Sequence, residues 1–325
     1  MNLERRDFLK VLSAGALTAG NVTSVFAGIR KTLSPDAVGI LYDGTICIGC
    51  KACEAACKQY NDMPPESGSL EKANGVDGIW DASYDMSEKT LNKIKLYEHG
   101  DASERNREEN GFAFVKRACM HCVDPDCVSA CPVTALTKNE TTGIVEYNKD
   151  ACIGCRYCMV ACPYNVPKFE YAKALPEIVK CEMCAHRQVE GDIPACCEFC
   201  PTGASLFGKV TDLMDEARKR IQLTAGTSYD YPMRDIESGD TSPKTVAPYI
   251  NYIYGEKEGG GTQYLLLSAI PFSKLGLPEL SETSSASKSE GIQHGIYKGM
   301  IAPIALLGGL LYGAYRTTNN ENSEG

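Results

Sequence analysis

The amino-acid sequence predicts an α+β fold of two pseudo-symmetric units, with a polar insertion and a C-terminal transmembrane helix. The first observation is an internal repeat, in which Gly39–Leu41 leads to Cys47–Cys50 and Gly143–Val145 leads to Cys152–Cys155. Each copy has the pattern of a short apolar strand, a cysteine-rich loop and a helical turn. The second observation is an uncharged stretch at residues 299–315, close to the C-terminal end.

Composition narrows the class of protein before any motif is considered. The chain has 325 residues, enough for one or two domains, and a formal net charge of −9. A nucleic-acid-binding surface needs concentrated positive charge, so no nucleic-acid partner is predicted. Seventeen cysteines are far more than ordinary usage, and they indicate either disulfides or bound metal.

Residues 1–27 have the features of an export signal. Arg5 and Arg6 precede a mainly apolar run from Val11 to Phe26, and small residues end it. The arginine pair resembles the twin-arginine signal, although Glu4 stands where Ser or Thr is usual. Because that route carries folded proteins with their cofactors, the sequence predicts delivery to the periplasmic side of the inner membrane.

The cysteines form four groups with similar internal spacing. They are Cys47, Cys50, Cys53 and Cys57; Cys119, Cys122, Cys127 and Cys131; Cys152, Cys155, Cys158 and Cys162; and Cys181, Cys184, Cys196, Cys197 and Cys200.

Groups one and three have the spacing C-x2-C-x2-C-x3-C. Three of those thiolates can bind one cubane cluster while the fourth reaches another cluster. A zinc site needs only two pairs and would not explain the third and fourth cysteines. Groups two and four vary the same pattern, with a longer interval before the third cysteine. Four [4Fe–4S] clusters are therefore predicted.

Disulfides are the competing explanation for an exported protein. The odd number of cysteines, the repeated cluster spacing and an export route open to folded proteins all argue against them. Sixteen ligands leave one cysteine over, which must be Cys196 or Cys197. The three-residue interval before the last cysteine of each other group favours Cys196 as the ligand beside Cys200, with Cys197 as a buried thiol.

Paired cluster motifs exchange their fourth ligands, so the groups must be paired. Groups two and three are adjacent in the sequence, which leaves groups one and four as the other pair. The predicted ligand sets are set A, Cys47, Cys50, Cys53 and Cys200; set B, Cys57, Cys181, Cys184 and Cys196; set C, Cys119, Cys122, Cys127 and Cys162; and set D, Cys131, Cys152, Cys155 and Cys158.

Several charged residues near the cysteines are candidates for tuning the clusters. Lys51, Arg156 and Lys180 can tune the reduction potential of a nearby cluster, or can be plain surface charges. His121 and His186 are also close to cysteines, with either a cluster or quinone role or an ordinary structural one.

The four-cluster body is predicted to span residues 28–222. Within it, residues 59–115 form the polar insertion, which is either a docking surface or an elaboration. We expect a hairpin of 135–137 with 144–147, and a helix from 211 to 223 capped by Thr211. Residues 223–290 are predicted to be an extended arm packing on partners, with one strand at 263–270.

Residues 291–316 are predicted to anchor the chain in the membrane. The uncharged core of this segment lies between Lys298 and Arg316, and Lys298 can extend toward the surface. A buried core helix is the alternative, but only a polar tail, 317–325, follows. Export of the body would leave that tail on the cytoplasmic side.

The motifs Cys119–Pro132 and Cys155–Lys168 are similar to those of four-cluster ferredoxin-type subunits of membrane oxidoreductases. Formate dehydrogenase, dimethyl sulfoxide reductase and nitrite reductase complexes have such subunits. The leader, Tyr254–Gln263 and Gln293–Met300 make the chain more similar to the HybA-type subunits of hydrogenase-2-like uptake hydrogenases.

This resemblance implies an electron-transfer subunit that takes electrons from the small and large subunits of a nickel–iron hydrogenase. It implies that an integral membrane quinone-reducing subunit receives them. The sequence holds no candidate nickel site, so catalysis is expected in a partner and this chain is not predicted to be the enzyme itself. The iron–sulfur subunit of a formate dehydrogenase, or of another molybdopterin oxidoreductase, is the alternative.

Overall fold

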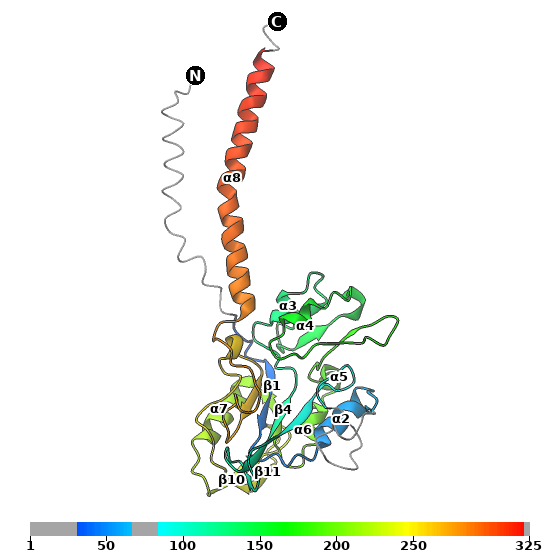
Figure 1. Ribbon diagram of the computed structural model, residues 1–325, viewed down its shortest axis with the longest axis vertical. Coiled ribbons are helices and arrows are strands. Elements are labelled where there is room, and N and C mark those ends of the chain that lie inside the picture. Colours follow the sequence, from blue (N-terminus) through cyan, green and yellow to red (C-terminus); the bar gives the residue numbers. More distant parts are fainter. Residues whose placement is uncertain (1–30, 67–83, 322–325) are drawn as a thin grey trace. The chain divides into compact units, whose positions relative to one another are not determined.

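The computed structural model of the protein describes residues 31–66 and 84–321. The predicted export signal, Trp80 of the insertion and the last four residues of the chain lie outside the described residues. Residues 31–284 form one compact unit, and the C-terminal helix belongs to a second. The mixture of helices and strands agrees with the predicted α+β class (Figure 1).

A three-stranded sheet forms the centre of the compact unit, with the order β12-β1-β9. Strand β1, Val38–Asp43, pairs antiparallel with β9, Ser205–Lys209, and parallel with β12, Tyr264–Leu267. All four residues of β12 are buried. Parallel pairing brings this late segment beside the first strand, so the sheet joins the two ends of the compact unit.

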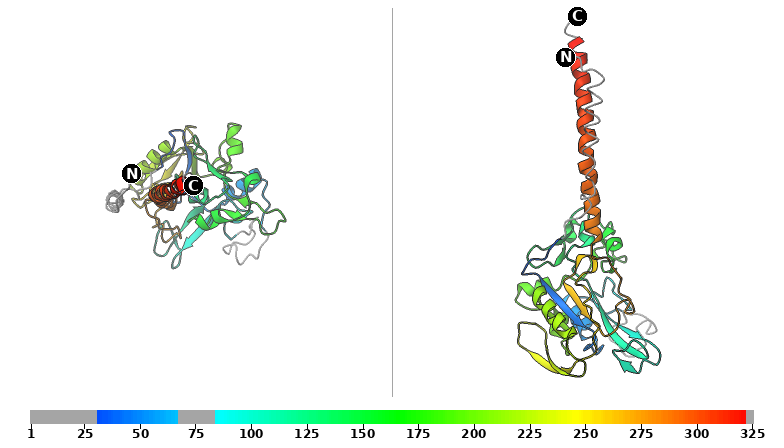
Figure 2. Two further views of the ribbon diagram at one scale, coloured as in Figure 1. Left: turned by 90° about the horizontal axis from the view of Figure 1, so that it is seen from above. Right: turned by 90° about the vertical axis from the view of Figure 1, so that its left-hand side faces the viewer.

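The two faces of this sheet have different roles. Leu41, with other leucines of the sheet, packs against helix α7, Val210–Ile221, which lies along β1 (Figure 2, right). Ile40 and Tyr42 point to the opposite face, because successive strand residues alternate. That second face belongs to the larger core, which includes many of the cysteines. The sheet therefore separates an ordinary leucine core from a cysteine-rich one.

The insertion contains a sheet of its own. Strands β2, Lys93–Glu98, and β4, Gly111–Arg117, pair antiparallel, and β3, Glu104–Arg105, adds in parallel to β4. Ile94 and Val115 are buried in the cysteine-rich core. No strand is predicted from the sequence in this insertion, and Lys93 of β2 is buried despite its charge.

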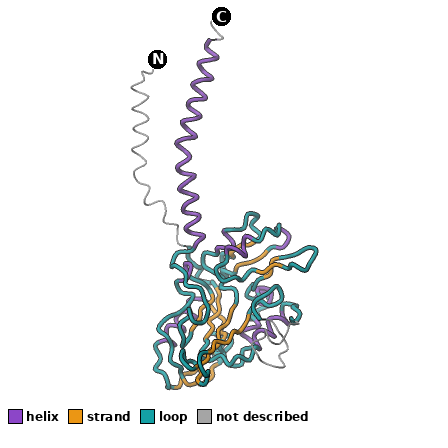
Figure 3. The backbone as a smooth tube through the Cα atoms, viewed as in Figure 1, coloured by secondary structure: helices purple, strands orange, loops and turns teal. Residues whose placement is uncertain are grey.

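Short helices follow or contain the cysteine motifs, and loops make up much of the compact unit (Figure 3). The helices are α2, Ala52–Tyr60; α3, Asp126–Ser129; α4, Tyr157–Ala161; α5, Ala185–Val189; and α6, Ala195–Glu198, with single 3₁₀ turns at Lys149–Ala151 and Glu258–Gly260.

Two predictions for local structure can be compared directly with the structure. The hairpin is confirmed as β5, Leu136–Lys138, with β6, Val145–Tyr147, and β7, Lys168–Phe169, forms a second one with β8, Ile178–Val179. The prediction that Thr211 caps helix α7 is wrong. Lys209 is the N-cap, without a side-chain cap, and Thr211 lies inside the helix with its hydroxyl donating to Asp212 Oδ1 at 3.1 Å.

The predicted arm is built into the compact unit. Strands β10, Ser228–Pro232, and β11, Thr241–Thr245, form a hairpin, and β12 lies in the central sheet. The strand expected at 263–270 is shorter in the structure. Whether the rest of the arm also packs on partners stays a prediction.

Helix α8, Ser285–Glu321, contains the predicted anchor. Among the described residues, the stretch Ser285–Tyr315 is long and apolar enough to cross a membrane, and an 18-residue window within it has a mean hydropathy of 1.4. Pro303 lies inside the helix and removes one backbone donor. Proline is tolerated in membrane-spanning helices, where local adjustments satisfy the freed carbonyl.

Candidate metal centres

The four C-x-x-C loops share one backbone feature, although their sequences differ. The residue before the second cysteine has a positive φ in each: 70° at Gly49, 44° at His121, 68° at Gly154 and 52° at Met183. Glycine adopts this left-handed conformation freely, whereas it costs other residues about 1–2 kcal/mol. The surrounding fold therefore holds His121 and Met183 there, and glycine in the sequence marks only two of the four loops.

In three of these loops the same residue donates its backbone N–H to the sulfur of the first cysteine. Amide donors of this kind stabilise the thiolate and tune a bound cluster. The N–Sγ distances are 3.4 Å from Gly49 to Cys47, 3.4 Å from Gly154 to Cys152 and 3.3 Å from Met183 to Cys181.

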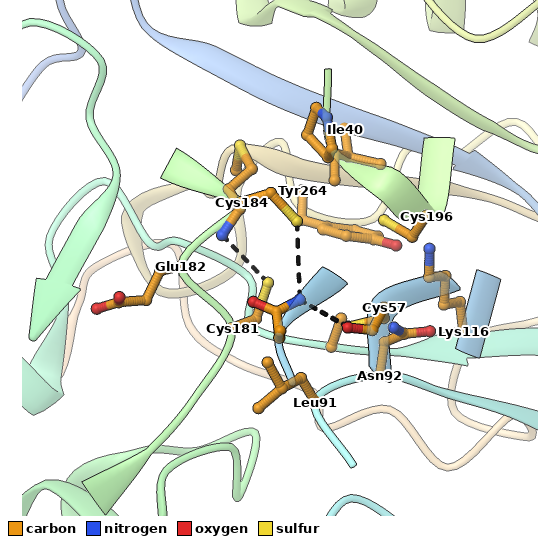
Figure 4. Close-up of a pocket in the computed structure, with 14 residues that line it drawn as sticks. Ile40, Cys57, Leu91, Asn92, Lys116, Cys181, Glu182, Cys184, Cys196 and Tyr264 are labelled. Atoms are coloured by element: carbon orange, nitrogen blue, oxygen red, sulfur yellow. Dashed lines mark hydrogen bonds between the residues drawn. The ribbon is translucent and has the colours of Figure 1, made fainter. Parts of the chain in front are cut away.

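The four thiols of set B line one cavity (Figure 4). Cys57 comes from α2, Cys181 and Cys184 precede α5, and Cys196 lies on α6. Asn61 ties two of these segments together, because its Nδ2 donates to Cys57 O at 2.7 Å and lies 4.0 Å from Cys184 Sγ. Residues 57 and 181 are far apart in the sequence, so only the fold brings this set together.

The four thiols of set D line a second cavity. Cys131 ends group two, and the other three belong to group three, so this set also joins two groups. Burial acts to raise the pKa of Cys131, but backbone N–H donors from four residues, Val133 to Leu136, lower it below its usual value. Ala135 N lies 3.2 Å from its sulfur. These donors therefore favour the thiolate form of Cys131.

Within set C, and separately within set A, thiols influence one another's pKa. Burial raises the pKa of Cys122 well above its usual value, and the neighbouring thiolates of set C raise it further. Burial also raises the pKa of Cys47, hydrogen bonds from Tyr42 and Gly49 lower it, and Cys200 and Cys50 raise it again. The thiols of sets B and D thus line one cavity each, thiols within set C and within set A influence one another's pKa, and the four ligand sets stay a prediction.

Electrostatic effects between thiols of different sets indicate which sets are neighbours. Burial raises the pKa of Cys53 in set A, and Cys196 of set B raises it as well. Cys181 of set B is similarly affected by burial and by Cys119 of set C. Burial raises the pKa of Cys127 in set C to about 12, with a contribution from Cys158 of set D. The thiols of the sets therefore influence one another in the order A, B, C, D, which differs from the order of the groups in the sequence.

These sites fit iron–sulfur clusters in their chemistry. All seventeen cysteines are among the described residues, and none is in a disulfide. Within 31–66 and 84–321, no three His, Cys, Asp or Glu side chains are arranged to hold a single metal ion. A cubane has a different requirement, because each of its thiolates binds a separate iron and the four surround a space. The thiols of sets B and D, which line a cavity and include sulfurs with amide donors, meet that requirement.

Comparison with known proteins identifies the family. The family model of the 4Fe-4S dicluster domain matches residues 111–210. The chain is 45% identical over 329 residues to the Hydrogenase-2 operon protein HybA of Escherichia coli O157:H7, covering 99% of this chain and 98% of that protein. The chain belongs to the HybA family. The predicted resemblance is thus confirmed, and [4Fe–4S] clusters are the cofactors that the matched domain indicates.

More distant relatives of this HybA-type chain belong to another kind of complex. The Formate dehydrogenase-O iron-sulfur subunit of Escherichia coli K12 is 33% identical over 279 residues, covering 83% of this chain and 78% of that subunit. The nitrate-inducible Formate dehydrogenase iron-sulfur subunit of the same organism is 32% identical over 235 residues, or 71% of each chain.

Cys196 and Cys197 are neighbours in sequence but differ in their surroundings. Cys196 lines the cavity of set B, whereas Cys197 is fully buried and is not part of that lining. A hydrogen bond from Cys197, together with Lys116, lowers the pKa of Cys196 to about 6 despite its burial. Burial and the Cys196 thiolate raise the pKa of Cys197. Cys196 is thus the better thiolate, and its role as ligand stays a prediction.

The charged candidates named from the sequence have varied positions. Lys180 is buried and donates to the backbone oxygen of Cys181 at 3.2 Å. Arg156 is exposed and lies over the ring of Phe169, 5.5 Å from its centre, although it also lines the cavity of set D. His186 is exposed, with Nε2 3.0 Å from Tyr60 O. The ordinary surface interpretation therefore fits His186.

His121 is buried between two ligands of set C. Its Nδ1 accepts the backbone N–H of Val145 at 3.1 Å, so the proton of the neutral ring resides on Nε2. Burial, with Lys180 and Lys138 nearby, lowers the pKa of His121 well below its usual value. It is therefore neutral, and its hydrogen bond with Val145 ties the loop of group two to strand β6.

Two lysines close to the cysteines were missed in the sequence. Lys138 donates to the backbone oxygen of Cys122 at 2.8 Å, and burial lowers its pKa to about 8. Lys116 lines the cavity of set B. Lys116 is the first residue after the predicted insertion, 59–115. Neither Lys116 nor Lys138 belongs to a sequence motif. Val115 and Lys116 are consecutive and both buried, so strict alternation along β4 would not have indicated that Lys116 is buried.

Proposed function

We propose that this chain is the electron-transfer iron–sulfur subunit of a nickel–iron hydrogenase complex. The HybA relative at 45% identity over nearly the whole chain carries the proposal. The row of four thiol sets supports it, because electron transfer over a long distance needs closely spaced carriers. When bound, [4Fe–4S] clusters supply one-electron transfer, and the chain's own thiols and amides hold and tune them.

The proposal assigns one [4Fe–4S] cluster to each of sets A to D. Sets A and B would form one double-cluster unit from groups one and four, and sets C and D the other from groups two and three. The two units would be related by pseudo-symmetry, as the repeated strand, loop and helix pattern suggests. Their arrangement as a row gives each electron one sequence of steps, between A at one end and D at the other.

The location of the chain is also part of the proposal. Residues 1–27 would direct export by the twin-arginine route, α8 would anchor the chain, and residues 317–325 would stay on the cytoplasmic side. The body would then lie at the periplasmic face of the inner membrane. The apolar composition of α8 supports the anchor, and the arginine pair supports the route.

The partners in this proposal are the hydrogenase small and large subunits and an integral membrane quinone-reducing subunit. Oxidation of one hydrogen molecule releases two electrons and two protons at the partner's site. This chain would then carry the two electrons one at a time toward the quinone. It would have no catalytic site of its own.

The test is purification from membranes in mild detergent under anaerobic conditions. We expect a nickel–iron large subunit in the complex, about sixteen irons per chain, and a broad visible absorption that dithionite bleaches. A molybdopterin subunit in place of the nickel–iron subunit would favour the formate dehydrogenase alternative, which the 33% identical relative supports. Absence of the visible absorption would contradict both.

A further inference from the structure

The side chain of Lys116 is buried in the middle of the cluster-binding region. It lies on β4 opposite Ile94 of β2 and is 1% exposed. Its Nζ donates to Ser205 Oγ at 3.1 Å, and it lies 6.0 Å from the centre of the Tyr264 ring. Figure 4 shows its ammonium pointing toward Cys196 and Tyr264.

Among the described residues, no carboxylate lies within ion-pair distance of the Lys116 ammonium. Lys93 on the neighbouring strand is equally buried, yet its Nζ lies 2.8 Å from Glu54 Oε2. A buried charge needs an opposite charge nearby, because burial removes its hydration. A serine hydroxyl does not carry that charge, so the anion beside Lys116 must come from another group.

The thiols of two ligand sets surround Lys116. Cys57 and Cys196 of set B line the same cavity. Cys53 of set A is also close, because the next residue, Glu54, accepts the backbone N–H of Ile94 at 2.7 Å, and Ile94 pairs with Lys116 across the two strands. One ammonium therefore lies against ligands of two successive sets in the row, at the junction between A and B.

We propose that Lys116 is a fixed cation that raises the reduction potentials of the clusters at sets A and B together. The inference rests on the proposed four-cluster function. One electron takes a cluster from [4Fe–4S]²⁺ to [4Fe–4S]¹⁺, with no bond made and no proton transferred. The cation stabilises the added negative charge, so reduction becomes more favourable at both sites. The A–B end of the row thereby retains electrons more strongly than it would without Lys116.

The experiment compares Lys116→Met with Lys116→Arg in the full-length chain, purified from membranes with its bound subunits. Redox titration followed by low-temperature EPR measures each cluster, and Cys→Ser variants in each set assign the signals. In Lys116→Met, we expect the reduced-to-oxidised ratio at sets A and B to fall at least about tenfold at a fixed potential, a shift of about 59 mV for one electron. Sets C and D should be unchanged, and Lys116→Arg should retain the original potentials.

Two variants of Ser205 separate charge from packing. Ser205→Ala removes the hydrogen bond but keeps the ammonium, so the potentials at A and B should stay close to those of the original chain. Ser205→Asp places a carboxylate beside Nζ and neutralises the charge in position. It should lower the potentials at A and B even where Lys116→Met fails to fold.

The outcomes also distinguish this inference from the proposed function. A purified original chain without clusters at A and B would overturn both. In another outcome, the original chain carries all four clusters while Lys116→Met or Ser205→Asp leaves the potentials at A and B unchanged. That result would overturn the role of Lys116 and leave the proposed function standing. An equal shift at all four clusters would also contradict it, because the ammonium lies against only two of the sets.

Discussion

The guanidinium of Arg220 and the carboxylate of Asp43 meet in the interior of the compact unit, with 3.2 Å between Nη1 and Oδ2 and both side chains fully buried. Arg220 lies near the end of α7 and Asp43 at the end of β1. Glu216 also pairs with Arg220, at 2.7 Å, and Tyr249 donates to Asp43 at 2.5 Å. This network joins the leucine core to the sheet from which the first cysteine group starts.

Replacement of Arg220 by Ala should strongly destabilise the protein. The change leaves two buried carboxylates without their cation, which costs about 3–5 kcal/mol in comparable buried pairs. Anaerobic urea unfolding, followed by the visible absorption of the clusters, measures the loss. Arg218→Ala is the matched control on the same helix, because Arg218 is 53% exposed where it pairs with Glu256. It should cost less than about 1 kcal/mol, and equal losses would contradict the assigned role of the network.

Binding of the full complement of iron should require Cys196 but not its neighbour Cys197. Cys196→Ala removes a predicted ligand of set B, so the iron content should fall by up to about four atoms per chain. Cys197→Ala removes a buried thiol outside the lining of that cavity and should keep about sixteen. Iron analysis of the two purified variants measures the difference. The reverse result would exchange the roles assigned to the two thiols.

The ligand groups could be predicted from the sequence because cysteine spacing is local and each motif carries its own geometry. The contacts between motifs depend on long-range structure. Lys116 reaches set B through strand pairing, and Glu54 meets Lys93 across 39 positions. Neither contact has a signature in the residues nearby, and a lysine in a strand ordinarily indicates an exposed position.

The central sheet illustrates the same limit. The apolar strands at β1 and β12 could each be recognised, but their parallel pairing depends on the return of the chain after the whole cluster region. Thr211 shows a different limit. A threonine before an apolar run is a good capping signal, yet the helix begins one residue earlier because Lys209 lies at the end of the buried strand β9.

Iron should become easier to remove as the pH falls, and set D should retain it longest. Burial raises the pKa of Cys57 from 9.0 to about 12, and that of Cys127 also to about 12, so protons compete with iron for these sulfurs throughout the neutral range. In the iron-free fold, this raised pKa contributes stability that is fully present below 9.0 and lost as the pH rises through 12. Loading is therefore favoured by higher pH.

Cys131 provides the internal comparison for this pH effect. Its backbone donors lower its pKa, so protons compete less well for its sulfur. Extraction by a chelator that stays deprotonated between pH 6 and pH 9, followed by EPR, should remove the set C signal before the set D signal. Faster loss at pH 9 than at pH 6 would contradict the linkage.

Two glycines with the same backbone conformation should respond differently to alanine. Gly49 and Gly154 have φ values of 70° and 68°, so the conformational cost of about 1–2 kcal/mol is shared. A Cβ at position 154 would lie 3.5 Å from Phe169, an ordinary contact, whereas at position 49 it would lie 2.3 Å from Phe114. The Phe114 ring would have to move from its edge-on contact with Phe112. Urea unfolding should therefore show an additional loss of about 1–3 kcal/mol in Gly49→Ala, and equal losses would mean that the ring moves without cost.

A chain that ends at Glu290 should leave the membrane. Residues 31–284 form a compact unit without the apolar part of α8, so the truncated body has its own core. In cells that lack the partner subunits, we expect the truncated chain in the soluble periplasmic fraction and the full chain in carbonate-washed membranes. A chain that ends at Arg316 is the control, because it loses only the tail and keeps the apolar stretch. If the chain that ends at Glu290 stays in washed membranes without its partners, α8 is not the anchor and another surface of the body binds the lipid.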